Sequence, residues 1–164
     1  MIRPLQPEDA DELAALYLAN REFLAPFEPP RPDGFFTADG QRERLAEPPP
    51  TETHRYAILD GDAIAGTINV ANIVHGPFRS ANLGYFVDRA RNGRGLATAA
   101  VGDVVGVAFG ELSLHRLEAG TLVDNVGSQR VLEKNGFERI GIARRYLLIG
   151  GDWRDHVLFQ RVAD

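Results

Sequence analysis

A glycine-containing loop is the segment of this sequence with the clearest capacity to bind a ligand. It reads Asn92-Gly93-Arg94-Gly95-Leu96-Ala97 and stands between an expected strand, 81–87, and an expected helix, 96–109. The first amides of a helix lack intrahelical partners, and glycine lets the backbone approach a ligand closely. The helix dipole adds partial positive charge at the same point. The loop therefore predicts a phosphate site, although a tight turn that needs glycine for its dihedral angles has the same pattern.

Two other kinds of phosphate loop fit the sequence less well. A P-loop is excluded because no Gly-Lys-Ser/Thr follows the glycines. A dinucleotide-binding loop would find an acidic partner in Glu118, which lies 23 residues after Gly95. However, Glu118 falls inside the next expected strand, and three strands that pair as hairpins precede the unit. The dinucleotide interpretation is therefore the weaker one.

The composition bounds the remaining possibilities. With 164 residues the chain is expected to form a single domain, 1–164. The absence of cysteine excludes disulfides, thiolate metal sites and a cysteine nucleophile. A net charge of −5 with scattered basic residues argues against a nucleic-acid partner. No apolar run approaches the roughly 20 residues of a membrane helix, so we expect a soluble, cytoplasmic protein with no membrane partner.

The histidines show no arrangement that indicates a metal site. His54 and His115 lie on different expected elements without metal-ligand spacing, so no metal is predicted. Asp155 and His156 are adjacent on an expected strand and should point to opposite faces. No Gly-x-Ser-x-Gly motif supplies a hydrolase nucleophile. We therefore interpret the segment Trp153-Arg154-Asp155-His156 as strand structure.

The pattern of apolar residues, glycine and proline predicts an α+β (mixed α/β) fold. Proline is expected to prevent a regular helix over Phe23–Pro30, and Gly102 and Gly106 are expected to allow close packing on a sheet. The sheet should be mostly antiparallel, with one parallel crossover between Leu83 and Leu122. The expected helices are 8–20, 39–47, 96–109 and 126–135. The expected strands are 2–5, 55–59, 64–70, 81–87, 116–122, 139–148 and 153–161, the last two joined by Gly150-Gly151.

Several segments together resemble the GNAT N-acetyltransferases, in particular the RimJ/RimL branch that acetylates ribosomal protein N-termini, and RimJ most closely. The family's acetyl-CoA loop, Gln/Arg-x-x-Gly-x-Gly/Ala, aligns with Asn92, Gly95 and Ala97, and only Asn92 departs from it. Asn125 to Ser128 matches the family's Asn-x-x-Ser, and 135–137 matches Asn-Gly-Phe. Further similar segments are 20–24, 72–74, 76–78, 83–85 and 153–158.

The resemblance implies the GNAT fold, a twisted and mostly antiparallel sheet of about six or seven strands flanked by helices. In that fold the strand ending at Val87 splays from the parallel strand 116–122 and leaves a slot for the pantetheine arm of acetyl-CoA. Backbone amides of the glycine loop would hold the pyrophosphate, and backbone groups near Phe86 and Val87 would polarise the thioester carbonyl. The implied cofactor-binding residues are Phe86, Val87, Asn92, Gly93, Arg94, Gly95, Leu96, Ala97, Thr98, Asn125 and Ser128.

The resemblance also implies direct attack of an amine on the thioester. It assigns to Ser128 the hydrogen bond to the leaving thiolate, whereas the residues alone favour a first-turn helix serine that satisfies the backbone. No base is compelling. His75 is one candidate, because histidine is the residue type whose side chain can change its charge near neutral pH. Glu118 is the second candidate, since it borders the slot, but it is equally expected to form an ion pair with Arg116. A water relay would need neither.

The acceptor amine is expected to lie against residues of the proline-rich segment and of the central strands. Phe23, Leu24, Phe27, Asn72 and Tyr85 are the expected substrate-binding residues, although the aromatic side chains of the segment could simply cap the core. The resemblance implies a peptide or protein N-terminus as acceptor, such as that of a ribosomal protein. A free small amine is the alternative, and an acyl-CoA-binding module without turnover is a third reading.

Overall fold

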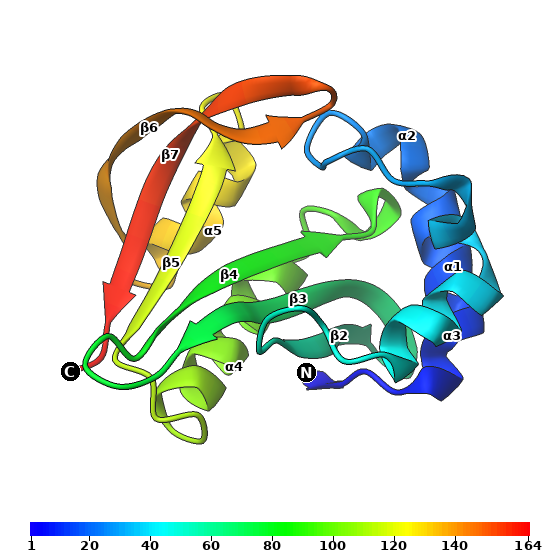
Figure 1. The fold of residues 1–164 in the computed structure, drawn as a ribbon, viewed down its shortest axis with the longest axis horizontal. Coiled ribbons are helices and arrows are strands. Elements are labelled where there is room, and N and C mark those ends of the chain that lie inside the picture. The colour runs from blue at the N-terminus through cyan, green and yellow to red at the C-terminus, as the bar shows by residue number, and fades with distance from the viewer.

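The computed structural model describes all residues 1–164 and contains one seven-stranded sheet, shown in Figure 1. The strand order is β1-β2-β3-β4-β5-β7-β6. Every neighbouring pair is antiparallel except β4 and β5, which are parallel. The expected fold class is therefore confirmed. The strands are β1 (Ile2–Pro4), β2 (His54–Asp60), β3 (Ala63–Val74), β4 (Ser80–Val87), β5 (Arg116–Leu122), β6 (Glu138–Ile149) and β7 (Asp152–Val162).

Helices cover the two faces of this sheet at different places. The helices are α1 (Ala10–Ala19), α2 (Arg21–Leu24), α3 (Ala38–Ala46), α4 (Leu96–Phe109) and α5 (Val126–Lys134), with short 3-10 turns at 7–9, 33–36 and 89–91. Ile58 packs with α4 in a core of 22 buried residues, whereas its neighbour Ala57 packs with α1 in a second core of 6. Successive strand residues point to opposite faces. Hence α4 and α5 lie on one face, and α1 to α3 lie at the β2–β3 end of the other (Figure 1).

Two local predictions are wrong. Helical structure continues through Phe23 and Leu24 as α2, because Pro26 constrains its own position and the residue before it rather than the preceding turn. Gly102 and Gly106 are exposed on α4 and do not contact the sheet. A methyl group on Gly102 would meet Asn135, the C-cap residue of α5, and one on Gly106 would meet nothing within 4 Å.

The parallel pair β4 and β5 separates along most of its length, as the resemblance implied. The two strands pair only at Ser80 with Arg116, Ala81 with Leu117 and Asn82 with Glu118. Beyond these residues β4 continues beside β3, and β5 continues beside β7 as far as Leu122. Backbone groups along the facing edges are therefore left without a ladder partner, which is where an extended ligand could bind. None of the helices is long and apolar enough to cross a membrane.

Candidate active site

A cleft of about 510 Å³ opens where β4 and β5 separate. Four segments meet there: α2 with the turn after it, the end of β4, the glycine loop with the start of α4, and α5 with its N-cap residue. The lining residues are Phe23, Leu24, Phe27, Tyr85, Phe86, Val87, Arg91, Asn92, Gly93, Gly95, Leu96, Ala97, Thr98, Asn125, Gly127, Ser128, Arg130, Val131 and Lys134. Most residues expected to bind the cofactor are thus brought to one place by segments far apart in the sequence.

The glycine loop borders the cleft with its backbone. Gly93 and Gly95 adopt φ angles of 79° and 80°, which residues with a Cβ rarely tolerate. Gly95 is the N-cap residue of α4, and the next residue, Leu96, is buried in the larger core and fixes the start of the helix. The first amides of a helix of 14 residues therefore face the cleft from a rigid support. This geometry suits a phosphate group.

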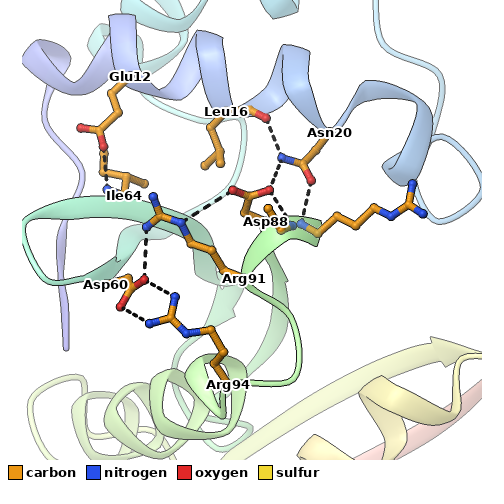
Figure 2. Close-up of polar contacts among 10 residues, drawn as sticks. Glu12, Leu16, Asn20, Asp60, Ile64, Asp88, Arg91 and Arg94 are labelled. Carbon is orange, nitrogen blue, oxygen red and sulfur yellow. Dashed lines mark hydrogen bonds and ion pairs between the residues drawn. The ribbon is translucent and has the colours of Figure 1, made fainter.

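A buried asparagine ties the glycine loop to the helix α1, as Figure 2 shows. Asn20 is 1% exposed, and its Nδ2 donates to the Leu16 carbonyl at 2.9 Å and to Asp88 Oδ1 at 3.1 Å. The backbone amide of Arg89 donates to Asn20 Oδ1 at 2.9 Å. Asn20 thereby fixes the segment between β4 and the glycine loop against the helix pair that carries Phe23. The sequence marked 20–24 as family-like but did not indicate this contact.

Two arginines near the loop differ in what they can bind. Arg94 donates to both carboxylate oxygens of Asp60 at 2.6 and 3.2 Å, and its side chain does not line the cleft. Arg91 lines the cleft and lies 3.6 Å from Asp60 and 3.8 Å from Asp88, too far for hydrogen bonds. Its buried Nη1 nitrogen has no hydrogen-bond partner. The dashed lines from Arg91 to Asp60 and Asp88 in Figure 2 are the two longer ion pairs. Of the two arginines, Arg91 is the one that lines the cleft, and cofactor binding by Arg94 stays a prediction.

Helix α5 brings two further cations that the sequence analysis missed. Arg130 and Lys134 both line the cleft and are four residues apart, so they lie on one side of the helix. The helical spacing of these cations beside a predicted phosphate loop was the available signal. Together with Arg91 they give one end of the cleft a positive character that the net charge of −5 conceals.

Ser128 sits in the first turn of α5 and is held by two neighbours. Its backbone amide donates to Oδ1 of Asn125, the N-cap residue, at 3.2 Å. Its Oγ lies 2.8 Å from the Tyr85 hydroxyl, which also donates to the Ser128 carbonyl at 3.2 Å. Burial raises the pKa of Tyr85 to about 12, so the phenol stays neutral at pH 7. Tyr85 therefore lines the cleft beside Ser128, and its expected contact with the acceptor stays a prediction.

Two residues expected at the site lie away from it. His75 Nε2 lies 2.7 Å from Glu52 Oε2, and the histidine side chain is 64% exposed. Asn72 occupies a bulge of β3 with φ of 53° and exchanges hydrogen bonds with Thr51 and Asn82. Both residues lie toward the end of the sheet at which β4 and β5 still pair. The structure therefore brings neither His75 nor Asn72 to the cleft.

Glu118 lies at the edge of the split without lining the cleft. It is the last β5 residue that pairs with β4, and Arg116 donates to its carboxylate at 2.6 Å. The Tyr146 hydroxyl approaches the other carboxylate oxygen at 3.5 Å. The expected ion pair with Arg116 is thus present, and a catalytic role for Glu118 stays a prediction. No group of three or more histidine, aspartate or glutamate side chains is placed to hold a metal ion.

Comparisons with known proteins agree with this geometry. A family model described as acetyltransferase (GNAT) domain matches residues 1–138. Probable N-acetyltransferase YjcK of Bacillus subtilis is 43% identical over 161 residues, which cover 94% of this chain and 89% of that protein. Ribosomal protein uS5-alanine N-acetyltransferase of Escherichia coli is 34% identical, over 96% of this chain and 84% of that one.

A solved structure gives the same result for the fold. Mycobacterium smegmatis RimJ, in complex with CoA-disulfide, superposes with a TM-score of 0.87 and 29% identity, covering 99% of this chain and 81% of that one. The family model spans most of the chain. The uS5-alanine enzyme exceeds 30% identity over 96% of this chain. The chain belongs to the GNAT family of N-acetyltransferases and resembles its RimJ-type members.

Proposed function

We propose that this chain binds acetyl-CoA in the cleft and transfers the acetyl group to the N-terminal α-amine of a protein, with ribosomal proteins as the expected partners. The observation that carries the proposal is the cleft itself. It joins an anion-binding loop at one end to a slot between unpaired strand edges, and it presents the Ser128 hydroxyl beside that slot.

The lining residues fit the chemical parts of acetyl-CoA. The glycine loop and Arg91, Arg130 and Lys134 supply donors and positive charge for phosphate groups. The unpaired edges of β4 and β5 offer backbone donors and acceptors to the amides of a pantetheine arm. Backbone groups at Phe86 and Val87 border the same slot and would stabilise negative charge on the thioester oxygen. The structure of RimJ with CoA-disulfide supports this assignment.

The residues of the cleft suit direct acyl transfer. The amine nitrogen forms a bond to the acetyl carbon, and the carbon–sulfur bond breaks with its electron pair on sulfur. When the single hydrogen of the Tyr85 hydroxyl is directed to Ser128 Oγ rather than to the Ser128 carbonyl, Oγ can donate its own hydrogen to that sulfur. Negative charge on the leaving group then meets a chain of two hydroxyls. No covalent enzyme intermediate is needed, in keeping with the lack of cysteine.

The acceptor proposal rests on the walls of the cleft and on the relatives. Phe23, Leu24 and Phe27 line the side of the cleft formed by α2 and the turn after it, as expected for an acceptor wall. The uS5-alanine N-acetyltransferase is named for an alanine of a ribosomal protein, and it matches 96% of this chain. These two observations favour a protein N-terminus over a free small amine.

Calorimetric titration with acetyl-CoA, with NAD as the control ligand, tests the cofactor assignment. Binding of acetyl-CoA alone supports the cleft assignment, whereas absence of acetyl-CoA binding overturns it. Transfer is then measured with peptides that have free or blocked N-termini and with polyamines and aminoglycosides. Acetylation that requires a free peptide N-terminus supports the proposal. Acetylation of free amines alone overturns the acceptor class, and binding without any transfer indicates a non-catalytic module.

A further inference from the structure

A buried histidine beside the split strands has no part in the function proposed so far. His156 on β7 is 4% exposed and pairs with Leu122 at the end of β5. The next residue, Val157, packs into the larger core with α4, so His156 points to the opposite face of the sheet. This open face lies across the sheet from α5 and therefore from Ser128. A buried titratable side chain in this place is unusual and calls for an explanation.

One hydrogen bond determines which ring nitrogen of His156 is basic. Nδ1 lies 3.0 Å from the backbone carbonyl oxygen of Arg154. A carbonyl oxygen can only accept, so in the neutral ring Nδ1 carries the proton and Nε2 carries the lone pair. Nε2 makes no hydrogen bond within the protein. The imidazole is thus held in the tautomer that can accept a proton at Nε2.

The position of Gly120 shows where this nitrogen points. A Cβ atom built on Gly120 would lie 3.6 Å from His156 Cδ2, the carbon bonded to Nε2. Gly120 lies on β5 two residues beyond Glu118, where the pairing with β4 has ended, and it is exposed. Leu158 Cδ2 and Tyr146 Cε1 lie 3.4 and 3.7 Å from the same position, so side chains of β6 and β7 pack over Gly120. Because Gly120 has no side chain, the edge of the ring that carries Nε2 lies over β5 on the open face, past the point at which the pairing with β4 ends.

The ionisable side chains around His156 are either neutral, ion-paired or exposed, so His156 is the available base among them. The Tyr146 ring of β6 packs against it with centroids 5.6 Å apart, and Leu122 and Ala143 flank it from the neighbouring strands. Burial, with the nearby Glu118, raises the pKa of Tyr146, so that phenol is neutral at pH 7. The Glu118 carboxylate forms an ion pair with Arg116. The Arg154 side chain is exposed to solvent.

We propose that His156 is the general base of the transfer and that its Nε2 accepts the proton of the acceptor ammonium, directly or through one water molecule. This inference rests on the proposed function. The ammonium gives up two protons in all. The first passes to Nε2 and then to solvent, which frees the nitrogen lone pair to form the bond to the acetyl carbon. The second is released after that bond forms and ends on the thiolate, which becomes the thiol of CoA. Acid and base thus act from opposite faces of the split sheet.

The substitutions His156→Gln and His156→Phe test this role, because the second keeps a planar ring against Tyr146 without a basic nitrogen. We expect kcat to fall about 100-fold or more in both variants, while the Kd of acetyl-CoA changes less than about twofold. The pH dependence of kcat/KM seen in wild type should be lost in both variants. The defect should shrink with acceptor amines that are already deprotonated at the assay pH. His115→Gln, at an exposed histidine, is the matched control and should behave as wild type.

Three results separate the outcomes. If both His156 variants transfer acetyl within about threefold of wild type with an unchanged pH profile, the inference is wrong and the proposed function stands. If Glu118→Gln alone abolishes the pH dependence, Glu118 is the base. If wild type acetylates no amine, the proposed function itself fails together with its base. Nitrogen NMR of the unmodified protein gives an independent check, since a neutral His156 with its proton on Nε2 would contradict the proposal without any substitution.

Discussion

The Tyr85 hydroxyl lies 2.8 Å from Ser128 Oγ, although the two residues are 43 positions apart in the chain. Tyr85 reaches the serine from β4, one of the two strands that separate, and Ser128 comes from the first turn of α5. Since burial raises the pKa of Tyr85 to about 12, the phenol remains a donor across the physiological pH range. The phenol has one hydrogen, so Ser128 Oγ is free to donate toward the cleft when that hydrogen is directed to Oγ rather than to the Ser128 carbonyl.

The Tyr85–Ser128 pair should behave as one unit in transfer. We expect Ser128→Ala to lower kcat about 10- to 100-fold, because a hydrogen bond to a charged group contributes about 1.5–3 kcal/mol. Tyr85→Phe should lower it less, and adding it to Ser128→Ala should have little further effect. Steady-state kinetics gives kcat, and calorimetry should show an unchanged Kd for acetyl-CoA. Fully additive effects on kcat would show that the two hydroxyls act separately.

Arg91 and Arg94 form a matched pair for testing the phosphate end of the cleft. Arg91→Ala should raise the Kd of CoA about 10- to 100-fold, since Arg91 lines the cleft and contacts Asp60 and Asp88 only through ion pairs of 3.6 and 3.8 Å. Arg94→Ala should change the Kd less than about threefold, because this arginine is exposed and its guanidinium donates hydrogen bonds to Asp60. Calorimetry at two salt concentrations measures both. A larger loss for Arg94→Ala would place the phosphate groups on the other side of the loop.

Gly66 and Gly106 should respond in opposite directions to the same substitution. A Cβ on Gly66 would lie 2.1 Å from the Phe86 carbonyl oxygen, so Gly66→Ala has to push β3 from β4 and should destabilise the protein by about 1–3 kcal/mol. Gly106 has open space in the interior of α4, and Gly106→Ala should stabilise it by about 1 kcal/mol. Urea denaturation of each variant measures the free energy of unfolding. Equal effects of the two substitutions would contradict the close approach of the strands at Gly66.

Asp9 should make the stability depend on pH in the acidic range. Arg3 donates two hydrogen bonds of 2.8 Å to this carboxylate and lowers its pKa below the ordinary 3.8, and the Gln6 amide donates a third. A lowered pKa in the folded state stabilises it above the ordinary value, and that stability is lost as the pH falls through the folded value. Asp9→Asn should therefore cost about 1–2 kcal/mol at pH 7.

Denaturation of wild type and Asp9→Asn at pH 7 and at about pH 3 measures this difference. The gap between the two proteins should narrow at the lower pH, because the carboxylate begins to take up its proton there. Asp11→Asn is the control, since this aspartate has 79% of its side chain exposed. A gap that stays constant with pH would show that Asp9 acts only through its shape and its backbone contact.

The helices and strands and their order along the chain could be predicted from the sequence alone. The helix 96–109 and the strand 116–122 begin and end where they were expected, and Gly150-Gly151 turns the last hairpin with both φ angles positive. Gly93 and Gly95 likewise adopt the left-handed conformations that their loop suggested. These features depend on neighbours in the chain, namely on apolar periodicity, helix ends and the freedom of glycine. Local patterns are therefore enough to predict them.

The contacts between side chains that are far apart in the sequence depend on the tertiary structure. The sequence could not show that Arg91 rather than Arg94 reaches the cleft, or that Tyr85 points to Ser128. Nor could it show that the Nε2 edge of His156 borders Gly120, since this depends on the register of β5 against β7. A shift of one residue in that register would turn every side chain of the strand to the other face. The site is therefore a product of long-range strand pairing, and above all of a parallel ladder that ends after three residue pairs.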